Sequence, residues 1–197
     1  MPKENGEPDD KAQLNFTDKD SKILKTSDGF VQGYNCQLAV DSANQIIVAH
    51  ATMNEQCDTT QLPAIVRRIK MNTGRQAREL SADAGYLSEA NLRELKRRHI
   101  RGYIATGRQK HSATATPPAK RRPNRGPLTV LMNQRLQRGG WRSRYRLRKQ
   151  VVEPVIGQIK QNRGHRAFLL RGLRKVRLEW GLVCTAHNLA KLTARPR

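Results

Sequence analysis

Asp83 is one of two acidic residues whose type and position suggest chemistry. It follows a short apolar stretch and precedes Gly85 and a helix that Ser88 would cap. A carboxylate at the carboxyl end of a strand in an open α/β sheet is well placed to hold a divalent metal. An Asp in a turn also caps the helix that follows it, and the local sequence favours neither interpretation over the other.

Glu153 is the second such residue, because only it and Glu179 are acidic within residues 101–197. Lys149, four residues earlier, and Lys160, seven residues later, share its helical face. One interpretation is an ordinary surface ion pair with Lys149, which stabilises little. The other is functional: a phosphate-binding surface should exclude acids, so Glu153 would be a metal ligand facing a phosphodiester, with Lys160 on a DNA phosphate.

The net charge of +22 lies entirely in the second half of the 197-residue chain. Residues 1–100 contain 14 basic residues (Lys and Arg) and 14 acidic residues (Asp and Glu). Residues 101–197 contain 24 basic residues and two acidic residues. A polyanion is the expected partner, because neutralising phosphates releases condensed counterions. An RNA-binding tail without specificity, a merely soluble basic surface and a surface that binds acidic lipid are the alternatives.

Several classes of protein are excluded or disfavoured by the composition. No apolar run approaches the ~20 residues of a membrane helix, and the polar, acidic N-terminus resembles neither a signal nor a transit peptide. The three widely spaced cysteines predict reduced thiols, and with the five histidines they form no zinc-binding spacing. No small-molecule substrate is indicated.

The periodicity predicts an α/β fold with a mixed sheet and flanking helices. Strands are expected at 30–40 and 45–51, as a hairpin, and at 77–82 and 101–106; helices are expected at 59–73, 88–98, 142–161 and 173–192. Pro154 should kink the third helix. The chain divides into a flexible lead-in (1–25), a first part with Asp83 (26–107), a basic Pro-rich linker or insertion (108–140) and a C-terminal helical part with Glu153 (141–197).

The motifs together resemble the catalytic core of bacterial insertion-sequence DDE transposases, from about Asn15 to Leu192. The resemblance rests on the order and spacing of these stretches: Asn15-Phe16-Thr17-Asp18, Gly29-Phe30-Val31-Gln32-Gly33-Tyr34-Asn35, Asp83-Ala84-Gly85-Tyr86, Arg148-Lys149-Gln150-Val151-Val152-Glu153-Pro154, Gly157-Gln158-Ile159-Lys160, Phe168-Leu169-Leu170-Arg171-Gly172-Leu173, and Glu179-Trp180 through His187-Asn188-Leu189.

The resemblance implies a ribonuclease-H-like fold in which three carboxylates hold two Mg²⁺ (or Mn²⁺) ions. These ions drive cleavage at transposon ends and attack of a 3′-hydroxyl on target DNA. Asp83 matches the second acid, Glu153 the third, and Lys160 the lysine of the signature around that Glu. The implied partners are double-stranded DNA, at transposon ends and target, and a second copy of the chain in a homodimer. The implied location is the bacterial cytoplasm, at the nucleoid.

The chain departs from the family pattern at three positions. Lys149 occupies the signature's Arg position and Arg146 its Tyr position, with Tyr145 one residue away. The first Asp, which the family carries as Asp-Gly-Thr on the first strand, has no match, and that strand and the N-terminal DNA-binding region are missing too. We therefore expect a C-terminal portion of a transposase whose autonomous catalysis is impaired.

DNA contacts are expected from the basic segment around Glu153. The candidates are Arg142, Arg144, Tyr145, Arg146, Arg148, Lys149, Lys160 and Arg163, with Trp141 as a further stacking residue. Phe168 and Trp180 are expected in the core. The rival hypotheses are a non-catalytic basic DNA- or RNA-binding protein and a vestigial product. Convergence of Asp83 and Glu153 would favour the enzyme, and a wide separation the binding protein.

Overall fold

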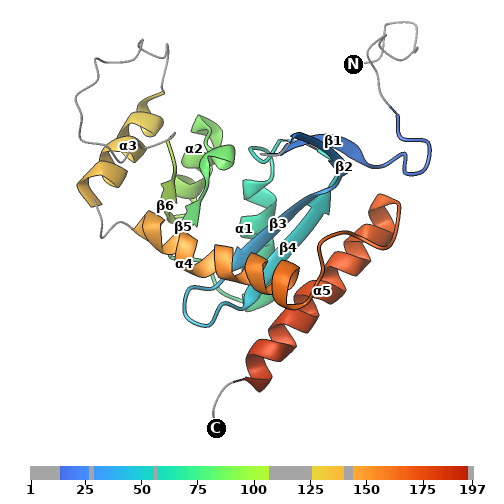
Figure 1. Ribbon diagram of the computed structural model, residues 1–197. Helices are drawn as coiled ribbons and strands as arrows, with labels where there is room; N and C mark the ends of the chain where they lie inside the picture. Colours follow the sequence, from blue (N-terminus) through green and yellow to red (C-terminus); the bar gives the residue numbers. More distant parts are fainter. Residues whose placement is uncertain (1–13, 27–28, 56, 107–125, 140–143, 195–197) are drawn as a thin grey trace, which may run out of the picture.

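The computed structural model describes residues 14–26, 29–55, 57–106, 126–139 and 144–194 (Figure 1). Four strands come first, helices then alternate with two further strands, and helices alone make up the C-terminal part. The elements are β1 (Lys22–Thr26), β2 (Gly29–Gly33), β3 (Asn35–Val40), β4 (Ile47–Met53), α1 (Leu62–Thr73), β5 (Glu79–Ala82), the 3₁₀ turn η1 (Ala84–Tyr86), α2 (Glu89–Arg97), β6 (Arg101–Ile104), α3 (Pro127–Gly139), α4 (Arg144–Gly157), the π-helical turn η3 (Gln158–Asn162) and α5 (Leu173–Thr193).

The described strands pair two by two. β1 with β2 and β3 with β4 are antiparallel, and β5 with β6 is parallel, with α2 as the crossover. The α/β class is therefore confirmed, whereas the single mixed sheet expected from the sequence is replaced by three separate pairs. The strand expected over 30–40 is interrupted at Tyr34, so that its first part pairs with β1 and its second part with β4.

The lead-in expected at residues 1–25 contains both a strand and a set of helix-capping contacts. Asp20 accepts a hydrogen bond from the backbone N–H of Leu173 (2.8 Å), and Asp18 accepts one from Gly172 (3.3 Å) and one from the Tyr34 hydroxyl (2.6 Å). These N–H groups at the start of α5 have no partner within the helix. The described part of the lead-in thus fixes the beginning of the last helix, 153 residues away.

The sequence signals for α1 and α2 are confirmed. Gly74 ends α1 in the left-handed conformation, and the Ser88 side chain caps α2 by accepting from the backbone N–H of Asn91 (3.1 Å). Leu92 and Leu95 are buried, as their spacing predicted.

Helix α3 lies inside the segment predicted to be a linker. Its start is held by the Glu89 carboxylate of α2, which accepts hydrogen bonds from the backbone N–H groups of Leu128 and Thr129. Bonds from Thr129 lower the pKa of Glu89. A side chain on Gly126 would collide with Glu89. Because these contacts are tertiary, the local composition of Pro and basic residues did not reveal this helix.

Pro154 lies inside α4 without ending it. Proline lacks the N–H that would bond to the carbonyl of Gln150 one turn earlier. The Gln45 side chain, from the turn between β3 and β4, donates to that carbonyl instead (3.1 Å). The helix then widens into η3, which contains Lys160. The π-helical turn changes the register that Lys149, Glu153 and Lys160 were expected to share.

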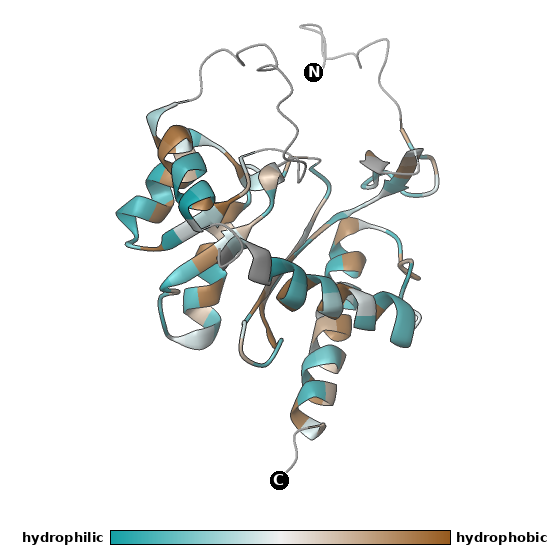
Figure 2. Ribbon diagram, turned by 60° about the vertical axis from the view of Figure 1, so that its left-hand side comes forward, coloured by the Kyte–Doolittle hydropathy of each residue, from teal (hydrophilic) through white to brown (hydrophobic). Residues whose placement is uncertain are grey.

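Helix α5 runs along β4 and closes its outer edge with side chains. Asn188 both donates to and accepts from the backbone of Ile47 (2.9 and 2.8 Å), and Arg177 donates to the carbonyl of Thr52 (2.9 Å). Asn72 of α1 donates to the carbonyl of Val48 on the same strand (2.9 Å). The helices of Figure 2 are banded in polar and apolar residues, as expected where one helix face covers a core.

Two hydrophobic clusters form the core. The α2 cluster joins α1, α2, β5, β6 and α3: Leu62, Val66, Ala82, Leu92, Leu95, Ile100, Ile104, Met132 and Leu136. The α5 cluster joins β4, α4, η3 and α5: Ile47, Val155, Ile159, Trp180 and Cys184, with Phe168 against it. The core positions of Trp180 and Phe168 are confirmed. None of the helices in the described ranges has both the length and the apolar composition to span a bilayer.

Candidate active site

Asp83 lies directly after β5 and caps the η1 turn. Its Oδ1 accepts a hydrogen bond from the backbone N–H of Gly85 (3.1 Å), and its side chain is 48% exposed. Asp83 therefore caps the short η1 turn and not the helix that follows it, since Ser88 caps α2. Capping uses only Oδ1 of the carboxylate. Its Oδ2 takes no part in the cap, so Asp83 can cap the turn and have a second role.

Glu153 and Glu179, the two acids of the basic half, are used in different ways. Glu179 accepts hydrogen bonds from the backbone N–H groups of Leu169 and Leu170 (2.8 and 2.9 Å), and so holds the loop before α5. Glu153 is 53% exposed on α4 and, among the described residues, its carboxylate contacts only a guanidinium. Glu179 is thus structural, whereas the fold gives Glu153 no comparable task.

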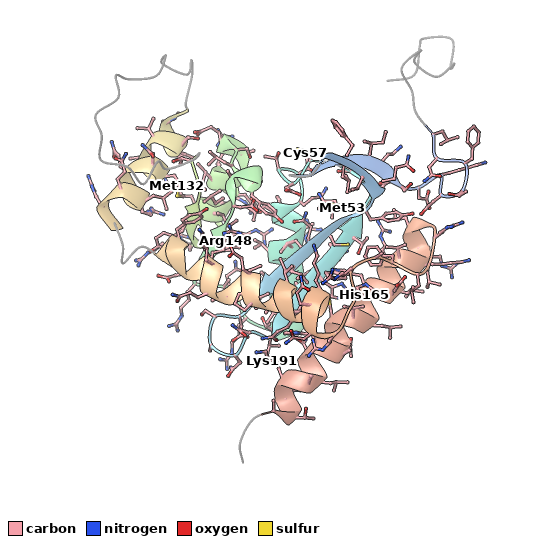
Figure 3. All side chains as sticks on the ribbon, in the orientation of Figure 1. Met53, Cys57, Met132, Arg148, His165 and Lys191 are labelled. Carbon is pink, nitrogen blue, oxygen red and sulfur yellow. The ribbon has the colours of Figure 1, made fainter. Side chains whose placement is uncertain are left out.

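Arg148 stands between the two acids. Its Nη1 lies 3.9 Å from Oδ2 of Asp83, and its Nη2 lies 3.8 Å from Oε1 of Glu153. Figure 3 shows Arg148 at the end of α4 nearest β5 and β6. Its guanidinium carbon lies 5.9 Å from the centre of the Tyr145 ring. The side chain is 21% exposed, and its Nε is buried without a hydrogen-bond partner among the described residues. Acids 70 residues apart in the sequence therefore flank one cation.

Asp58 is a third carboxylate in this region, and the sequence analysis did not single it out. Its Oδ1 accepts hydrogen bonds from the side chains of Asn35 (2.6 Å) and Gln37 (2.8 Å) on β3. Its Oδ2 and the Oδ1 of Asp83 lie 2.8 and 3.2 Å from the point where a Cβ on Gly85 would stand. The only sequence signal was an Asp shortly before a helix, which has an ordinary capping interpretation.

The pKa of Tyr86 reflects the proximity of these acids. Burial is the largest cause of the raised pKa of Tyr86, and the charges of Asp58 and Asp83 raise this pKa further. The absence of a side chain on Gly85 lets both carboxylates approach the η1 turn. The turn after β5 is therefore a region of concentrated negative charge.

The residues expected to contact DNA fall into three groups. Arg142 lies outside the described residues, as do the side chains of Arg144 and Arg146. Tyr145 packs against the α2 cluster, and Arg148 lies between the acids. Lys149 and Lys160 are exposed to solvent.

Lys160 and Arg163 lie at the η3 end of the site. The charge of Lys160 acts on the Cys36 thiol, whose pKa burial raises to about 11. Arg163 Nη1 lies 3.0 Å from Nδ1 of the buried His187, so part of its guanidinium is engaged inside the protein. Lys160 therefore stands beside β3, at a different place from the Asp83–Arg148–Glu153 group.

The donor set has the chemistry of a site for a hard divalent cation, because Asp83 and Glu153 offer carboxylate oxygens. Its size is limited: within the described ranges, no three His, Cys, Asp or Glu side chains are close enough together to hold a metal ion. The structure thus brings the two predicted ligands to one guanidinium without assembling a complete set.

A cavity of about 1230 Å³ opens beside the acids. It extends from Asp83 and Arg148 to Lys160 and Trp180, with β3 and β5 on two sides. The apolar side chains of Val152 and Ile156 on α4 line it as well. Asp83 and Arg148 of the candidate active site therefore line a partly apolar hollow that also reaches residues of both clusters.

Comparison with known proteins agrees with the motifs of the C-terminal part. Residues 120–193 match the family model described as "Transposase DDE domain", a range that includes Glu153 and Lys160 but not Asp83. No curated protein and no solved structure gives a significant match to the chain. The resemblance to DDE transposases is thereby confirmed over residues 120–193, where the chain is similar to a transposase DDE domain.

Proposed function

We propose that the chain is part of a DDE transposase, with a ribonuclease-H-like core that cleaves DNA at the ends of a mobile element and joins them to target DNA. The match over residues 120–193 supports the family. The observation that carries the proposal is the convergence of Asp83 and Glu153 on Arg148. A protein that only binds DNA has no need for two acids facing each other at the edge of a strongly basic region.

Arg148 supports a cation-binding role for this position. Its guanidinium is at 3.8–3.9 Å from both carboxylates, beyond hydrogen-bonding distance, and both acids are about half exposed. Such contacts hold a side chain weakly, so a divalent cation could compete for the same carboxylates. Asp83 and Glu153 would hold Mg²⁺ or Mn²⁺, which supplies a Lewis acid for the phosphodiester and an activated water.

The protein's own cations would bind the DNA backbone. Lys149 is exposed on α4, directly after Arg148 in the sequence, and Lys160 is exposed on η3 and lines the cavity. Phosphate contacts of this kind fix the orientation of a duplex without reading its sequence. Arg148 has a different role in the proposal: it neutralises Asp83 and Glu153 when no metal is bound, and so lowers their repulsion of phosphate.

Two carboxylates are fewer than the three that the resemblance implies. Asp58 lies near Asp83 but is bonded to two amide side chains of β3. Since a missing ligand removes most of the activity of a metal site, we propose that this chain binds DNA and cations but cleaves DNA poorly by itself. The homodimer implied by the resemblance remains a prediction, which sedimentation analysis with and without DNA would test.

Manganese binding tests the proposed cation site directly. Titration of the chain with Mn²⁺, followed by electron paramagnetic resonance, should show one weak site that Asp83→Asn and Glu153→Gln each abolish. Arg148→Ala should tighten this site roughly thirtyfold, because repulsion between a unit charge and the double charge of Mn²⁺ about 4 Å away in a water-like medium is worth about 2 kcal/mol. Glu94→Gln, at an acid paired with two arginines on α2, is the matched control and should change nothing.

Nicking of supercoiled plasmid in Mn²⁺ tests the chemistry separately. We expect strong, salt-sensitive binding to the plasmid and little nicking by the isolated chain. Robust nicking that depends on Glu153 would refute the proposed shortage of ligands while supporting the enzyme. DNA binding without any Mn²⁺ site would instead favour the alternative function, a non-catalytic basic DNA- or RNA-binding protein, which the charge of the C-terminal half supports.

A further inference from the structure

The unsatisfied buried polar atoms of the structure gather around the cavity. Among the described residues, five buried side-chain atoms lack a hydrogen-bond partner: Gln37 Oε1, Gln76 Nε2, Arg148 Nε, His165 Nε2 and Trp180 Nε1. All five residues line the cavity. Buried polar groups in folded proteins are almost always paired. Because each of these atoms is already closed off by neighbouring protein atoms, their shared location indicates that the walls of the cavity are incompletely packed in the structure.

The walls of the cavity are strand edges. All six residues of β3 and all four residues of β5 line it, whereas a strand that presented one face would contribute alternate residues. β3 pairs only with β4, and β5 only with β6, among the described strands. The backbone edge of each strand on the side away from its partner is therefore directed at the cavity.

The opposite edges of the two pairs are covered by side chains. On β4, Asn72, Arg177 and Asn188 bond to backbone groups. On β6, Arg135 of α3 donates to the carbonyl of Gly102 (3.1 Å). The described residues supply no such contact to the backbone of β3. Because exposed strand edges invite pairing, the fold has closed its outer edges, whereas the inner edge of β3 stays open within the described ranges.

The dimensions of the cavity suit one strand. A six-residue strand is about 20 Å long, takes up about 4.8 Å of sheet width and fills a layer about 10 Å deep, or roughly 1000 Å³. The cavity measures about 1230 Å³. Leu62 and Ile65 of α1 and Val152 and Ile156 of α4 line it too. A strand covered by helices on both faces is apolar on both faces, which gives a nearly continuous Val- and Ile-rich run.

We propose that the cavity is a docking slot for one β-strand, donated by another polypeptide segment and paired with β3 on one side and β5 on the other. The donor is an extended, uncharged, Val- and Ile-rich stretch. Residues 1–13 and 107–125 of this chain contain no such run, so the donor lies outside these segments. The proposal concerns assembly of the fold and holds whether or not the chain cleaves DNA.

A synthetic peptide tests the slot. The probe has a Val- and Ile-rich centre with a Lys at each end, and the control peptide is the same except for a central proline, which cannot pair inside a sheet. The protein is the full chain with Trp141→Phe, which leaves Trp180 as its one tryptophan. We expect saturable binding of the probe, a change in Trp180 emission, a higher melting temperature and slower amide exchange in β3 and β5. The proline peptide should cause none of these.

Two protein variants separate pairing in the slot from general hydrophobic adhesion. Ile156→Glu places a charge in the slot at a side chain that is already 37% exposed, so the free protein should keep its stability while the probe binds about tenfold or more weakly. Met71→Glu, at a 73% exposed residue of α1 outside the slot, is the matched control and should bind normally.

Three results would overturn the proposal. They are equal binding of both peptides, binding that Ile156→Glu leaves unchanged, and no protection of β3 and β5 at saturating probe. The last result would mean that the cavity is filled by water or closed by direct contact of the two strand pairs.

Discussion

The two hydrophobic clusters are built in different ways. The α2 cluster draws its residues from one stretch of the chain, Leu62 to Leu136, and its helices and strands follow one another directly. The α5 cluster joins Ile47 to Trp180 and Cys184, so it depends on contacts across more than 130 residues. Closing a long loop costs more entropy than closing a short one. We therefore expect the α2 cluster to form first and to survive when the α5 cluster opens.

The candidate site lies at the junction of these two regions. Asp83 belongs to the β5 side, and Glu153 belongs to α4, which packs against β3, β5 and β6 (Figure 1). The cavity separates the two clusters, and α4 bridges it. The relative position of Asp83 and Glu153 therefore depends on how firmly the regions around the α2 cluster and the α5 cluster are held together.

Truncation of the two cores should have the largest effect. Leu95→Ala in the α2 cluster and Ile159→Ala in the α5 cluster each remove a side chain that is 2% exposed, which costs about 2–5 kcal/mol of unfolding free energy. Amide hydrogen exchange should show that Ile159→Ala loosens β3, β4 and α5 while α2 and β6 keep their protection. If both variants accelerated exchange equally in all elements, the two clusters would form one cooperative unit.

His187 is the buried polar link of the α5 cluster. Its Nε2 lies 2.9 Å from the carbonyl of Gln45, and its Nδ1 faces Arg163. The arginine donates to Nδ1, so the neutral ring donates from Nε2. Replacing it by Leu leaves both partners unpaired and should cost about 1–3 kcal/mol, measured by urea unfolding.

The same histidine should make stability pH-dependent. Burial lowers the pKa of His187 below 6.5, and the charges of Arg163 and Lys191 lower it further. Below pH 6.5 the unfolded state binds a proton that the folded state resists, so stability present above that pH is lost as the pH falls. His187→Gln should flatten this dependence. Because the pKa of His50 is also lowered, His50→Gln is the comparison variant; an unchanged slope in His187→Gln would assign the effect to His50.

Gly85→Ala should disturb the acidic turn between the two halves. The new Cβ would stand 2.8 Å from Oδ2 of Asp58, so that carboxylate must move, at a cost of about 1–3 kcal/mol. Gly157→Ala is the control: it is helical with φ −60° and has nothing within 4 Å of the new Cβ, so it should be neutral or slightly stabilising. Equal melting temperatures for the two variants would contradict the crowding at Gly85.

Glu94→Gln should give the smallest effect, confined to the α2 region. Hydrogen bonds from Arg97 and Arg98 lower the pKa of Glu94 from 4.5 to about 2. The ionised pair therefore stabilises the fold above pH 4.5, and this contribution is lost as the pH falls from 4.5 toward 2. Acid unfolding followed by circular dichroism should be less steep in Glu94→Gln over that range, with α2 affected before α5. An identical acid transition would show that the pair contributes nothing measurable.

Much of the local structure was predictable, whereas β1 and α3 were not. The signals at Gly74 and Ser88 are local, since a left-handed glycine and a serine cap act within a few residues of their helix. β1 is a short stretch, Lys-Ile-Leu-Lys-Thr, that forms a strand by pairing with β2. α3 begins where Glu89 of another helix accepts hydrogen bonds from its first N–H groups. Pairing and capping by distant residues leave no periodic trace in the segment itself.

The candidate site was predictable in its residues but not in its arrangement. Asp83 and Glu153 were identified because acids at a strand end and in a basic helix are chemically unusual. Arg148, which was predicted to contact DNA, lies between them, and Asp58 was not identified at all. Which cation stands between two carboxylates depends on packing of α4 against β5, a contact between residues about 70 positions apart.

The sequence by itself determined the charge division of the chain, most of its helices and strands, and the two acids, because these follow from composition and from periodicity within short windows. Only the tertiary structure decided that the strands form separate pairs, that Glu179 holds a loop while Glu153 does not, and that open strand edges enclose a cavity. These properties depend on the distance between segments remote in the chain, and local patterns carry no information about that distance.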